Sequence, residues 1–323
     1  MRAAFIEQPG GAIRLGRLPV PCPGPTDVLV RVQASGVNHV DLFVRSGAYR
    51  TPMPRPFVLG RDLVGSVAGL GAGVSGFAVG ERVWCNSLGH AGRQGALAEY
   101  AVVAADRLYP LPAQADAQQA VAMLHTAATA HIGLVREARL QAGETLLVEG
   151  AGGGVGSAVV QLARCMGARV IATASARDAA WCRQCGADVV LDYRTADLYQ
   201  QVSQAAPEGI DLWWDNSGRH DFLAVLPLMR LGGRVLVMSG LGGASASLPV
   251  GQLYTRDVSL HGFAISNASA ADLARAAAAM NRLFAAGRLQ ARIGATFHLA
   301  DVAQAYAAVQ AGGVNGRIVV LVE

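Results

Sequence analysis

The sequence predicts an α/β protein of two domains, one rich in β-strands and one with a parallel sheet covered by helices on both faces. Two observations support this prediction. Residues 1–115 hold short apolar runs separated by Gly and Pro, and from Ala117 the rhythm changes to strand, helix, strand. The length of 323 residues is sufficient for two domains.

The first 115 residues are typical of an all-β module. Gly- and Pro-rich segments such as PVPCPGPTD and RTPMPRPF separate the apolar runs, as turns separate short strands. The expected strands are, in chain order, AAFI, DVLVRVQAS, LVGSVAGLG, ERVWC and ALAEYAVVA.

The second part of the chain alternates apolar strands with helices. Near-continuous apolar strands are typical of a parallel sheet that is buried on both faces. The alternating segments are TLLVEGA, SAVVQLARCMG, ARVIATAS, DAAWCRQCG, ADVVLDY, IDLWWDNSG, FLAVLPLMRLG, GRVLVMSG and VSLHGFAI. An amphipathic helix, ADLARAAAAMNRLFAAG, then precedes a last helix, LADVAQAYAAVQAG, and a last strand, GRIVVLVE. Trp213 and Trp214 are unusual in a strand of this kind, and we expect at least one of them in the core.

A glycine cluster, EGAGGGVGS at residues 149–157, lies between an apolar strand and a helix. A helix N-terminus presents unpaired N–H groups, and glycines let the backbone approach a pyrophosphate closely. The segment departs from the GxGxxG pattern because alanine occupies the first position. With the strand before it and the helix after it, the segment still predicts a dinucleotide site. The alternative is a turn that only permits tight packing. The expected binding residues are Ala151, Gly153, Gly154, Val155 and Gly156.

The end of the second strand of this part predicts which dinucleotide binds. Folds selective for NAD usually place an acidic residue there, to bind the ribose 2′-hydroxyl. Here the chain has Ser175 and Arg177, and Tyr193 follows the next strand. A hydroxyl and a guanidinium favour a 2′-phosphate, so we predict NADP(H) rather than NAD(H). Asp178 beside Arg177 weakens the positive field, and Arg177 as a solvated residue is the alternative.

Composition argues against several classes of partner. The net charge is +4 with scattered Lys and Arg, so we expect no nucleic-acid binding. No apolar run reaches the length of a membrane span, and the N-terminus lacks a signal-peptide pattern, so a cytoplasmic protein is expected. The five cysteines are expected to be reduced. Cys182 and Cys185 form a CxxC that we interpret as helix packing, although a redox pair or half a zinc site is the alternative.

Several segments, taken in their order, resemble the medium-chain dehydrogenases/reductases, specifically the zinc-free quinone oxidoreductase group, nearly end to end. They are ASGVNHVDLFVRSGAY, VLGRDLVGSVAGLG, GERVW, LAEYAVVAADRLYPLP, ETLLVEGAGGGVGSAVVQLARCMGARVIATA, GADVVLDYR, GIDLWWDNSG, LGGRVLVMSG and LADVAQAYAAVQAGGVNGRIVV. The resemblance implies a GroES-like catalytic domain at residues 1–116, completed by 266–323, and a Rossmann domain at 117–265. It also implies a cofactor in the cleft between them and a homodimer paired through VSLHGFAI.

Relatives with this fold that are zinc alcohol dehydrogenases keep an early Cys, a His-Glu pair and a cysteine-rich loop. At these places the chain has Asn38, then Arg61 and Asp62, and a loop that holds only Cys85. A catalytic zinc needs about three protein ligands and a structural zinc four. We therefore expect no metal, and a zinc-type alcohol dehydrogenase is a disfavoured alternative.

Without a Lewis acid, a conjugated acceptor is the easier substrate, because the charge that hydride brings spreads to a remote oxygen. We therefore expect hydride transfer to a quinone or an α,β-unsaturated carbonyl. The resemblance implies Asn38 and Tyr49 as the polar pair near nicotinamide and substrate, and both can donate hydrogen bonds. His125 is a further candidate for substrate contact. A nucleotide-binding scaffold without turnover remains the alternative outside the enzyme class.

The family pattern also implies further cofactor contacts at strand ends, where open α/β sheets bind ligands. The segments at residues 49–57 and 242–254 are expected to line the substrate pocket. Asn315 and Arg317, in the last segment, are expected to reach the phosphates of the cofactor. The implied contacts are Thr129, Asn216, Ser239, Gly240, Leu241, Phe263, Asn315 and Arg317.

Overall fold

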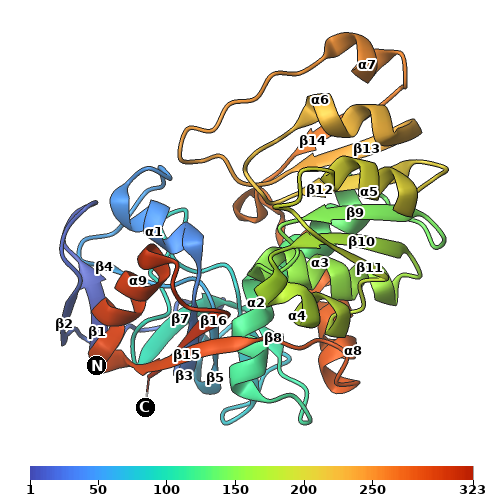
Figure 1. The fold of residues 1–323 in the computed structure, drawn as a ribbon. Coiled ribbons are helices and arrows are strands. Elements are labelled where there is room, and N and C mark those ends of the chain that lie inside the picture. Colours follow the sequence, from blue (N-terminus) through green and yellow to red (C-terminus); the bar gives the residue numbers. More distant parts are fainter. Residues whose placement is uncertain (323) are drawn as a thin grey trace. The chain divides into compact units, whose positions relative to one another are not determined.

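The computed structural model describes residues 1–322 and divides into two compact units (Figure 1). Unit 1 comprises residues 1–128 and 268–322, and unit 2 comprises residues 129–267. The first boundary falls inside helix α2 (Ala117–Ile132) rather than before it. The early turns of α2 belong to unit 1 because its carbonyl groups at Ala122 and Leu124 accept hydrogen bonds from side chains of that unit.

Unit 1 is the expected β-rich module and holds two sheets. A three-stranded sheet has the order β2-β1-β4, and a seven-stranded sheet has the order β15-β16-β3-β5-β6-β8, with β7 also paired to β3. The long strand β3 buries Val28, Val30 and Val32 on one face, as the two-residue period of a strand predicts. The bounds are β1 Arg2–Ile6, β2 Arg14–Arg17, β3 Asp27–Val37, β4 Phe57–Val58, β5 Leu63–Leu70, β6 Arg82–Cys85, β7 Tyr100–Ala104, β8 Tyr109–Pro110, β15 Ile293–His298 and β16 Arg317–Leu321.

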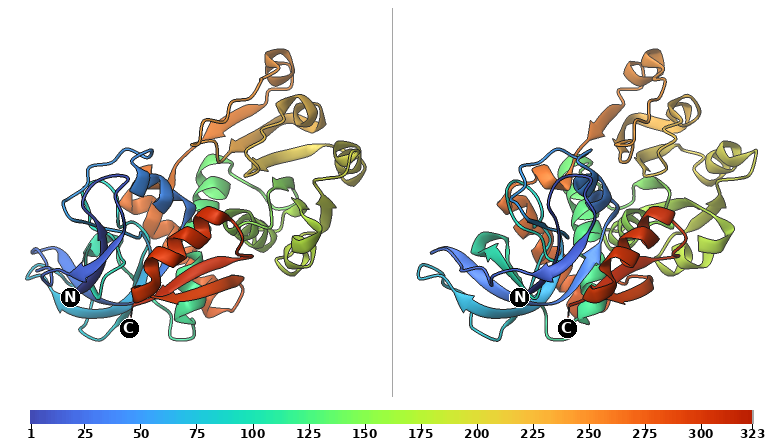
Figure 2. Two further views of the ribbon diagram at one scale, coloured as in Figure 1. Left: turned by 60° about the vertical axis from the view of Figure 1, so that its left-hand side comes forward. Right: turned by 90° about the vertical axis from the view of Figure 1, so that its left-hand side faces the viewer.

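The end of the chain returns to unit 1, as the resemblance implies. Strand β16 pairs antiparallel with β3 and parallel with β15. Figure 2 shows this red segment beside the blue N-terminal strands in both views. Unit 1 also contains helices α1 (His39–Ser46), α8 (Ala270–Ala285) and α9 (Val302–Ala311). The return places Arg317, at the start of β16, close to Asn38, which directly follows β3.

Unit 2 contains one parallel sheet of six strands in the order β11-β10-β9-β12-β13-β14. This is the doubly wound order of the Rossmann fold, in agreement with the prediction. The strands are β9 Thr145–Glu149, β10 Arg169–Ala174, β11 Val189–Asp192, β12 Ile210–Asp215, β13 Met229–Val237 and β14 Ser259–Gly262. The helices are α3 Gly154–Cys165, α4 Ala179–Gln184, α5 Leu198–Ala205, α6 Phe222–Val225 and α7 Val250–Tyr254.

Helices cover both faces of the unit 2 sheet. Right-handed crossovers place α3 and α4 on one face and α5 and α6 on the other, because the strand order reverses after β11. Figure 1 draws α3 and α4 along one side of this sheet and α6 along the other. Helix α6 is shorter than the segment FLAVLPLMRLG suggests, since it ends before Pro227 and strand β13 begins at Met229.

Trp213 and Trp214 point to opposite faces of β12, and both are fully buried. Trp213 packs in the core under α5 and α6, with its ring edge-on to Phe222. Trp214 packs against Gly133, where an added Cβ would lie 2.2 Å from the indole ring. The expectation that at least one of the pair lies in the core is confirmed.

Among the helices of residues 1–322, none has both the length and the apolar character that crossing a membrane requires.

Candidate functional site

The glycine turn of unit 2 connects β9 to α3. Gly153 is the N-cap residue of α3, its backbone is extended, and among residues 1–322 no side chain caps this helix end. The first N–H groups of α3 therefore keep their hydrogen-bonding capacity for a ligand. A helix start of this kind fits an anionic group such as a pyrophosphate.

Gly153 and Gly156 differ in whether packing inside the protein requires a glycine at that position. A Cβ on Gly156 would lie 2.3 Å from the carbonyl oxygen of Gly150, so packing of α3 on the turn requires glycine there. A Cβ on Gly153 would meet only that same oxygen, at 3.4 Å, which is an ordinary contact. Tight packing alone therefore explains Gly156 but does not explain Gly153.

The end of β10 differs from the sequence-based expectation. The hydroxyl of Ser175 donates a hydrogen bond to Asp178 (Oγ to Oδ2, 2.7 Å). A Cβ on Gly152 would lie 2.7 Å from the Cβ of Asp178, so this acidic side chain packs against the glycine turn. Arg177 is exposed, with its Nε 4.0 Å from Asp178 Oδ1. A carboxylate thus occupies the place where the sequence suggested a hydroxyl and a guanidinium.

Two arginines flank the ring of Tyr193. The guanidinium carbons of Arg194 and Arg219 each lie 5.4 Å from the ring centroid. The sequence analysis identified Tyr193 but missed both cations. Arg194 is adjacent in the sequence and could have been found there. Arg219 follows β12, a strand distant in the sequence, so only the fold brings it to the tyrosine.

Several predicted cofactor contacts meet where the strands of unit 2 end. The Cβ of Asn216 lies 3.3 Å from the place of a Cβ on Gly150, so the turns after β12 and β9 touch. Ser239 has a positive φ of 84° and donates a hydrogen bond to the carbonyl of Asn216. Gly240 and the exposed Leu241 follow Ser239 in the chain.

The predicted contacts Phe263 and Thr129 also belong to unit 2, and the guanidinium carbon of Arg136 lies 6.0 Å from the ring centroid of Phe263. The ring of Phe263 packs edge-on against Trp214, with a centroid distance of 6.2 Å. Thr129 is buried in helix α2. Phe263 therefore has a packing role in unit 2 beside any role toward a ligand.

Two buried carboxyl groups lie at neighbouring strand ends, and the sequence analysis missed them. Glu149 and Asp215 are register partners on β9 and β12. Glu149 accepts hydrogen bonds from Trp213 Nε1 at 3.1 Å and from the Tyr199 hydroxyl at 3.3 Å. Asp215 Oδ2 lies 2.6 Å from Nδ1 of His220. Burial first, and then the charge of Asp215, raise the pKa of Glu149 to about 7.

In unit 1, Asn38 is buried, with 2% of its surface exposed, and its amide joins a carboxyl group and a guanidinium. Its Nδ2 donates to Asp62 Oδ2 at 2.8 Å, and its Oδ1 accepts from Nη2 of Arg317. Its backbone N–H donates to Asp41 Oδ2 at 2.8 Å, which ties the start of α1 to the cluster. The catalytic candidate is therefore held on three sides.

Arg317 is used inside unit 1, which differs from the phosphate contact suggested by the sequence. Besides Asn38, its guanidinium donates through Nε to the carbonyl of Ala122 at 3.0 Å. Asn315 lies in the turn before β16, where its backbone packs against Gly294.

The buried carboxyl groups around Asn38 hold their protons more strongly than usual. Burial is the main cause, and it raises the pKa of Asp41 to about 6 and that of Asp62 to about 8. Burial, followed by the charges of Arg61 and Arg317, lowers the pKa of His125 well below its ordinary value, so this imidazole stays neutral. The sequence analysis compared Asp62 with a zinc ligand position and did not recognise it as a partner of Asn38.

Tyr49, the second catalytic candidate, has its ring 5.6 Å from that of His90. Burial, followed by the charges of Arg61, Arg93 and Arg107, lowers the pKa of His90 to about 4. Tyr49 also donates its backbone N–H to the carbonyl of Phe43 and packs against the core of unit 1, and none of its described contacts is with Asn38.

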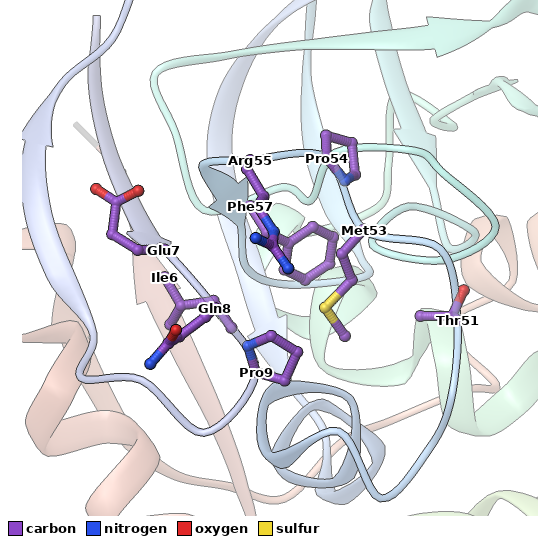
Figure 3. Close-up of a pocket in the computed structure, with 9 residues that line it drawn as sticks. All are labelled: Ile6, Glu7, Gln8, Pro9, Thr51, Met53, Pro54, Arg55 and Phe57. Carbon is purple, nitrogen blue, oxygen red and sulfur yellow. The ribbon is translucent and has the colours of Figure 1, made fainter.

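A pocket of about 180 Å³ opens between the segment that ends β1 and the loop before β4 (Figure 3). Figure 3 shows the side chain of Met53 directed toward Pro9 and the carboxylate of Glu7 directed away. Part of the loop at 49–57 lines this pocket, whereas Asn38, Tyr49 and the segment 242–254 do not. The lining residues are Ile6, Glu7, Gln8, Pro9, Thr51, Met53, Pro54, Arg55 and Phe57.

The donor groups of unit 1 do not fit a zinc ion. Within residues 1–322, no group of three His, Cys, Asp or Glu side chains is placed to hold a metal. The buried Arg61 stands where zinc-dependent relatives have a ligand, and a fixed cation there opposes a second cation. Cys182 and Cys185 are buried and not joined by a disulfide.

Two family models match the chain, "Alcohol dehydrogenase GroES-like domain" over residues 24–113 and "Zinc-binding dehydrogenase" over residues 154–282. The quinone oxidoreductase of Rattus norvegicus is 31% identical over 99% of this chain and 98% of its own length. A solved NAD-dependent alcohol dehydrogenase aligns over 100% of both chains, with 31% identity and a TM-score of 0.90. A mycobacterial protein complexed with NADPH also aligns over 100% of both chains, with 28% identity and a TM-score of 0.85.

Proposed function

Because the chain belongs to the medium-chain dehydrogenase/reductase superfamily, in its quinone oxidoreductase group, we propose that it transfers hydride from NADPH to a conjugated carbonyl compound without a metal ion. The substrate is a quinone or an α,β-unsaturated carbonyl. The observation that carries the proposal is the glycine turn, where α3 starts without a side-chain cap and Gly153 is free of internal packing demands.

Different groups of the chain perform the separate tasks of the reaction. A bound reduced nicotinamide supplies the hydride. The N–H groups at the start of α3 hold the pyrophosphate. In unit 1, Asn38 donates an amide N–H to the substrate oxygen on which negative charge grows, and Tyr49 is a second donor. The product gains one hydride and one proton, and the proton comes from Tyr49 or from water.

Two features of unit 2 bear on the choice of nucleotide. The paired guanidinium groups of Arg194 and Arg219 beside Tyr193 suit a 2′-phosphate, because charge-assisted hydrogen bonds to phosphate are strong. Asp178 against the glycine turn suits a 2′-hydroxyl instead. Two cations oppose one carboxylate, and we therefore propose NADP(H) as the preferred cofactor.

Replacing Arg194 and Arg219 together with alanine is expected to weaken NADPH binding about tenfold, or about 1.4 kcal/mol, and to leave NADH binding unchanged. Fluorescence titration with each nucleotide measures the two dissociation constants. Arg183→Ala, at an exposed cation of α4, is the matched control. An equal loss of affinity for both nucleotides, or no loss for either, would show that these arginines do not bind the 2′-phosphate.

The proposed reaction is tested by following NADPH absorbance with a panel of small quinones, enones and simple ketones. We expect turnover with the conjugated compounds, and we expect a chelator to leave it unchanged. A zinc alcohol dehydrogenase would favour the simple carbonyl and lose activity with the chelator. A nucleotide-binding scaffold would bind NADPH and oxidise it with no compound of the panel.

Strand β14 forms the outer edge of the unit 2 sheet, and the side chain of Leu260 is 41% exposed there. We propose that this edge pairs with its copy in a homodimer. Leu260→Arg places a charge on the exposed edge and is expected to convert the dimer to monomer in sedimentation experiments. Leu231→Ala, at an exposed leucine of the neighbouring strand, is the control. A wild-type monomer would refute the pairing.

A further inference from the structure

The amide of Asn38 is held between a carboxyl group and a guanidinium. Asp62, which directly precedes β5, accepts from the nitrogen end at 2.8 Å, and Arg317 at the start of β16 donates to the oxygen end. An amide that turned over would face Arg317 with its own N–H groups and Asp62 with its oxygen. The guanidinium of Arg317 can only donate hydrogen bonds, so its contact with the amide would be lost, and this arginine fixes one orientation of the amide.

Asp62 is one of the most completely buried polar groups of unit 1, with 1% of its surface exposed. Its Oδ1 is buried and has no partner among residues 1–322, while its Oδ2 accepts from Asn38. A charged carboxylate would leave one oxygen unsatisfied in this position, whereas a protonated acid carries no net charge. The burial of Asp62, with one oxygen unpartnered among residues 1–322, agrees with a raised pKa of this group.

The charged or titratable groups that face Asp62 come from three elements and from the loop before β5. They are Asp41 on α1, Arg61 beside it in the chain, Arg317 on β16 and the Cys85 thiol on β6. Burial outweighs the two arginines and raises the pKa of Asp62 to about 8. A protonated Asp62 leaves the positive charge of Arg317 uncompensated by its nearest acid.

We propose that Arg317 and Asp62 are positioning residues of the reaction, which hold the Asn38 amide from both ends so that its second N–H faces the substrate oxygen. This inference rests on the proposed hydride transfer. The bond from Arg317 draws electron density from the amide oxygen, and this makes the N–H group a stronger donor. The arrangement places cationic stabilisation behind an oxyanion donor.

Loss of the proton from Asp62 weakens this arrangement. An ionised Asp62 attracts Arg317 directly, competes with Asn38 for the guanidinium and cancels its charge at the substrate. Turnover is therefore expected to fall as the pH rises above about 8. This role of Arg317 differs from binding a phosphate of the cofactor. Loss of Arg317 would lower kcat and leave the affinity for the nucleotide unchanged.

The test uses the full-length protein with Arg317→Met, Arg317→Lys and Asp62→Asn. Arg317→Met is expected to lower kcat at least tenfold with an unchanged dissociation constant for NADPH, and Arg317→Lys is expected to restore part of it. Asp62→Asn is expected to remove the decline of kcat above pH 8. The controls are Arg31→Met and Asp106→Asn, at exposed residues of unit 1.

A weakened NADPH affinity with unchanged kcat in Arg317→Met would overturn the inference and restore the phosphate role. An alkaline decline that persists in Asp62→Asn would overturn the part played by Asp62.

Thermal unfolding of the protein without ligands separates this inference from the proposed function. Folded Asp62 keeps its proton to about pH 8, while in the unfolded chain an Asp loses it near pH 4. The folded state binds more protons between these values, so the Asp62 contribution to stability falls as pH rises through this window. Asp62→Asn is expected to reduce the loss of thermal stability with rising pH. An unchanged dependence of stability on pH would refute a protonated Asp62 in the folded state. Wild-type protein that binds NADPH but reduces no compound would refute the proposed function, and with it the positioning role, whatever the slope.

Discussion

Gly153→Ala is expected to weaken NADPH binding at least tenfold while leaving the melting temperature unchanged. The added Cβ would meet only the carbonyl oxygen of Gly150, at 3.4 Å, so the folded protein accommodates it. The same methyl group would project at the start of α3, where a pyrophosphate must approach the backbone. Calorimetric titration and thermal unfolding of the one variant measure the two effects separately.

Gly156→Ala is the matched comparison, because its clash lies inside the protein. Its Cβ would lie 2.3 Å from the oxygen of Gly150 and 2.7 Å from the Cα of Ala151. The turn must shift, and we expect a loss of about 1–3 kcal/mol in unfolding free energy together with weaker binding.

Equal NADPH affinity in wild type and Gly153→Ala would contradict a dinucleotide site at this turn. The glycine cluster would then only permit tight packing of α3 on the turn, which is the alternative that the sequence left open.

Trp213→Ala is expected to lower the free energy of unfolding by about 3–5 kcal/mol, the largest loss of stability that we predict. The indole is fully buried under α5 and α6, so its removal leaves a cavity lined by Phe222 and its neighbours. It also takes away the N–H donor of the buried Glu149 carboxyl. Urea unfolding measures the loss, with Leu223→Ala, at an exposed leucine of α6, as the control. A loss below 1 kcal/mol would contradict the packing described here.

The carboxyl of Glu149 adds a pH dependence to this core. Its pKa is about 7 in the folded protein, whereas an unfolded Glu loses its proton near pH 4.3. The folded state binds the extra proton between these values, so the Glu149 contribution to stability falls as pH rises from about 4 to 7. Glu149→Gln keeps an acceptor for Trp213 and is expected to reduce the difference between unfolding at pH 5 and pH 8. An unchanged difference would show that Glu149 is not the group responsible.

Local patterns predicted much of the fold. The alternation of apolar runs gave the strands of the β-rich unit, and the strand–glycine–helix order located the turn between β9 and α3. Boundaries were less accurate where long-range packing decides them. Helix α2 contributes its early turns to unit 1, and β13 begins earlier than its apolar pattern indicates. No local signal reports such contacts, because they depend on residues far along the chain.

In the candidate site, too, local patterns identified some residues, and long-range packing supplied their partners. Asn38 and Tyr193 were visible in the sequence, but their partners Asp62, Arg317 and Arg219 were assigned other roles or missed. Arg317 on β16 and Asp62 just before β5 reach Asn38 because both strands pair with β3, and Arg219 reaches Tyr193 from the turn after β12, in the same sheet as β11. The sequence by itself determined the fold class and the glycine turn, since both follow from periodicity and from the backbone freedom of glycine. Only the tertiary structure decided which side chains are buried together. Burial raises the pKa of Asp62, because charge is costly away from water, and hydrogen bonds with Asp62 and Arg317 orient the Asn38 amide.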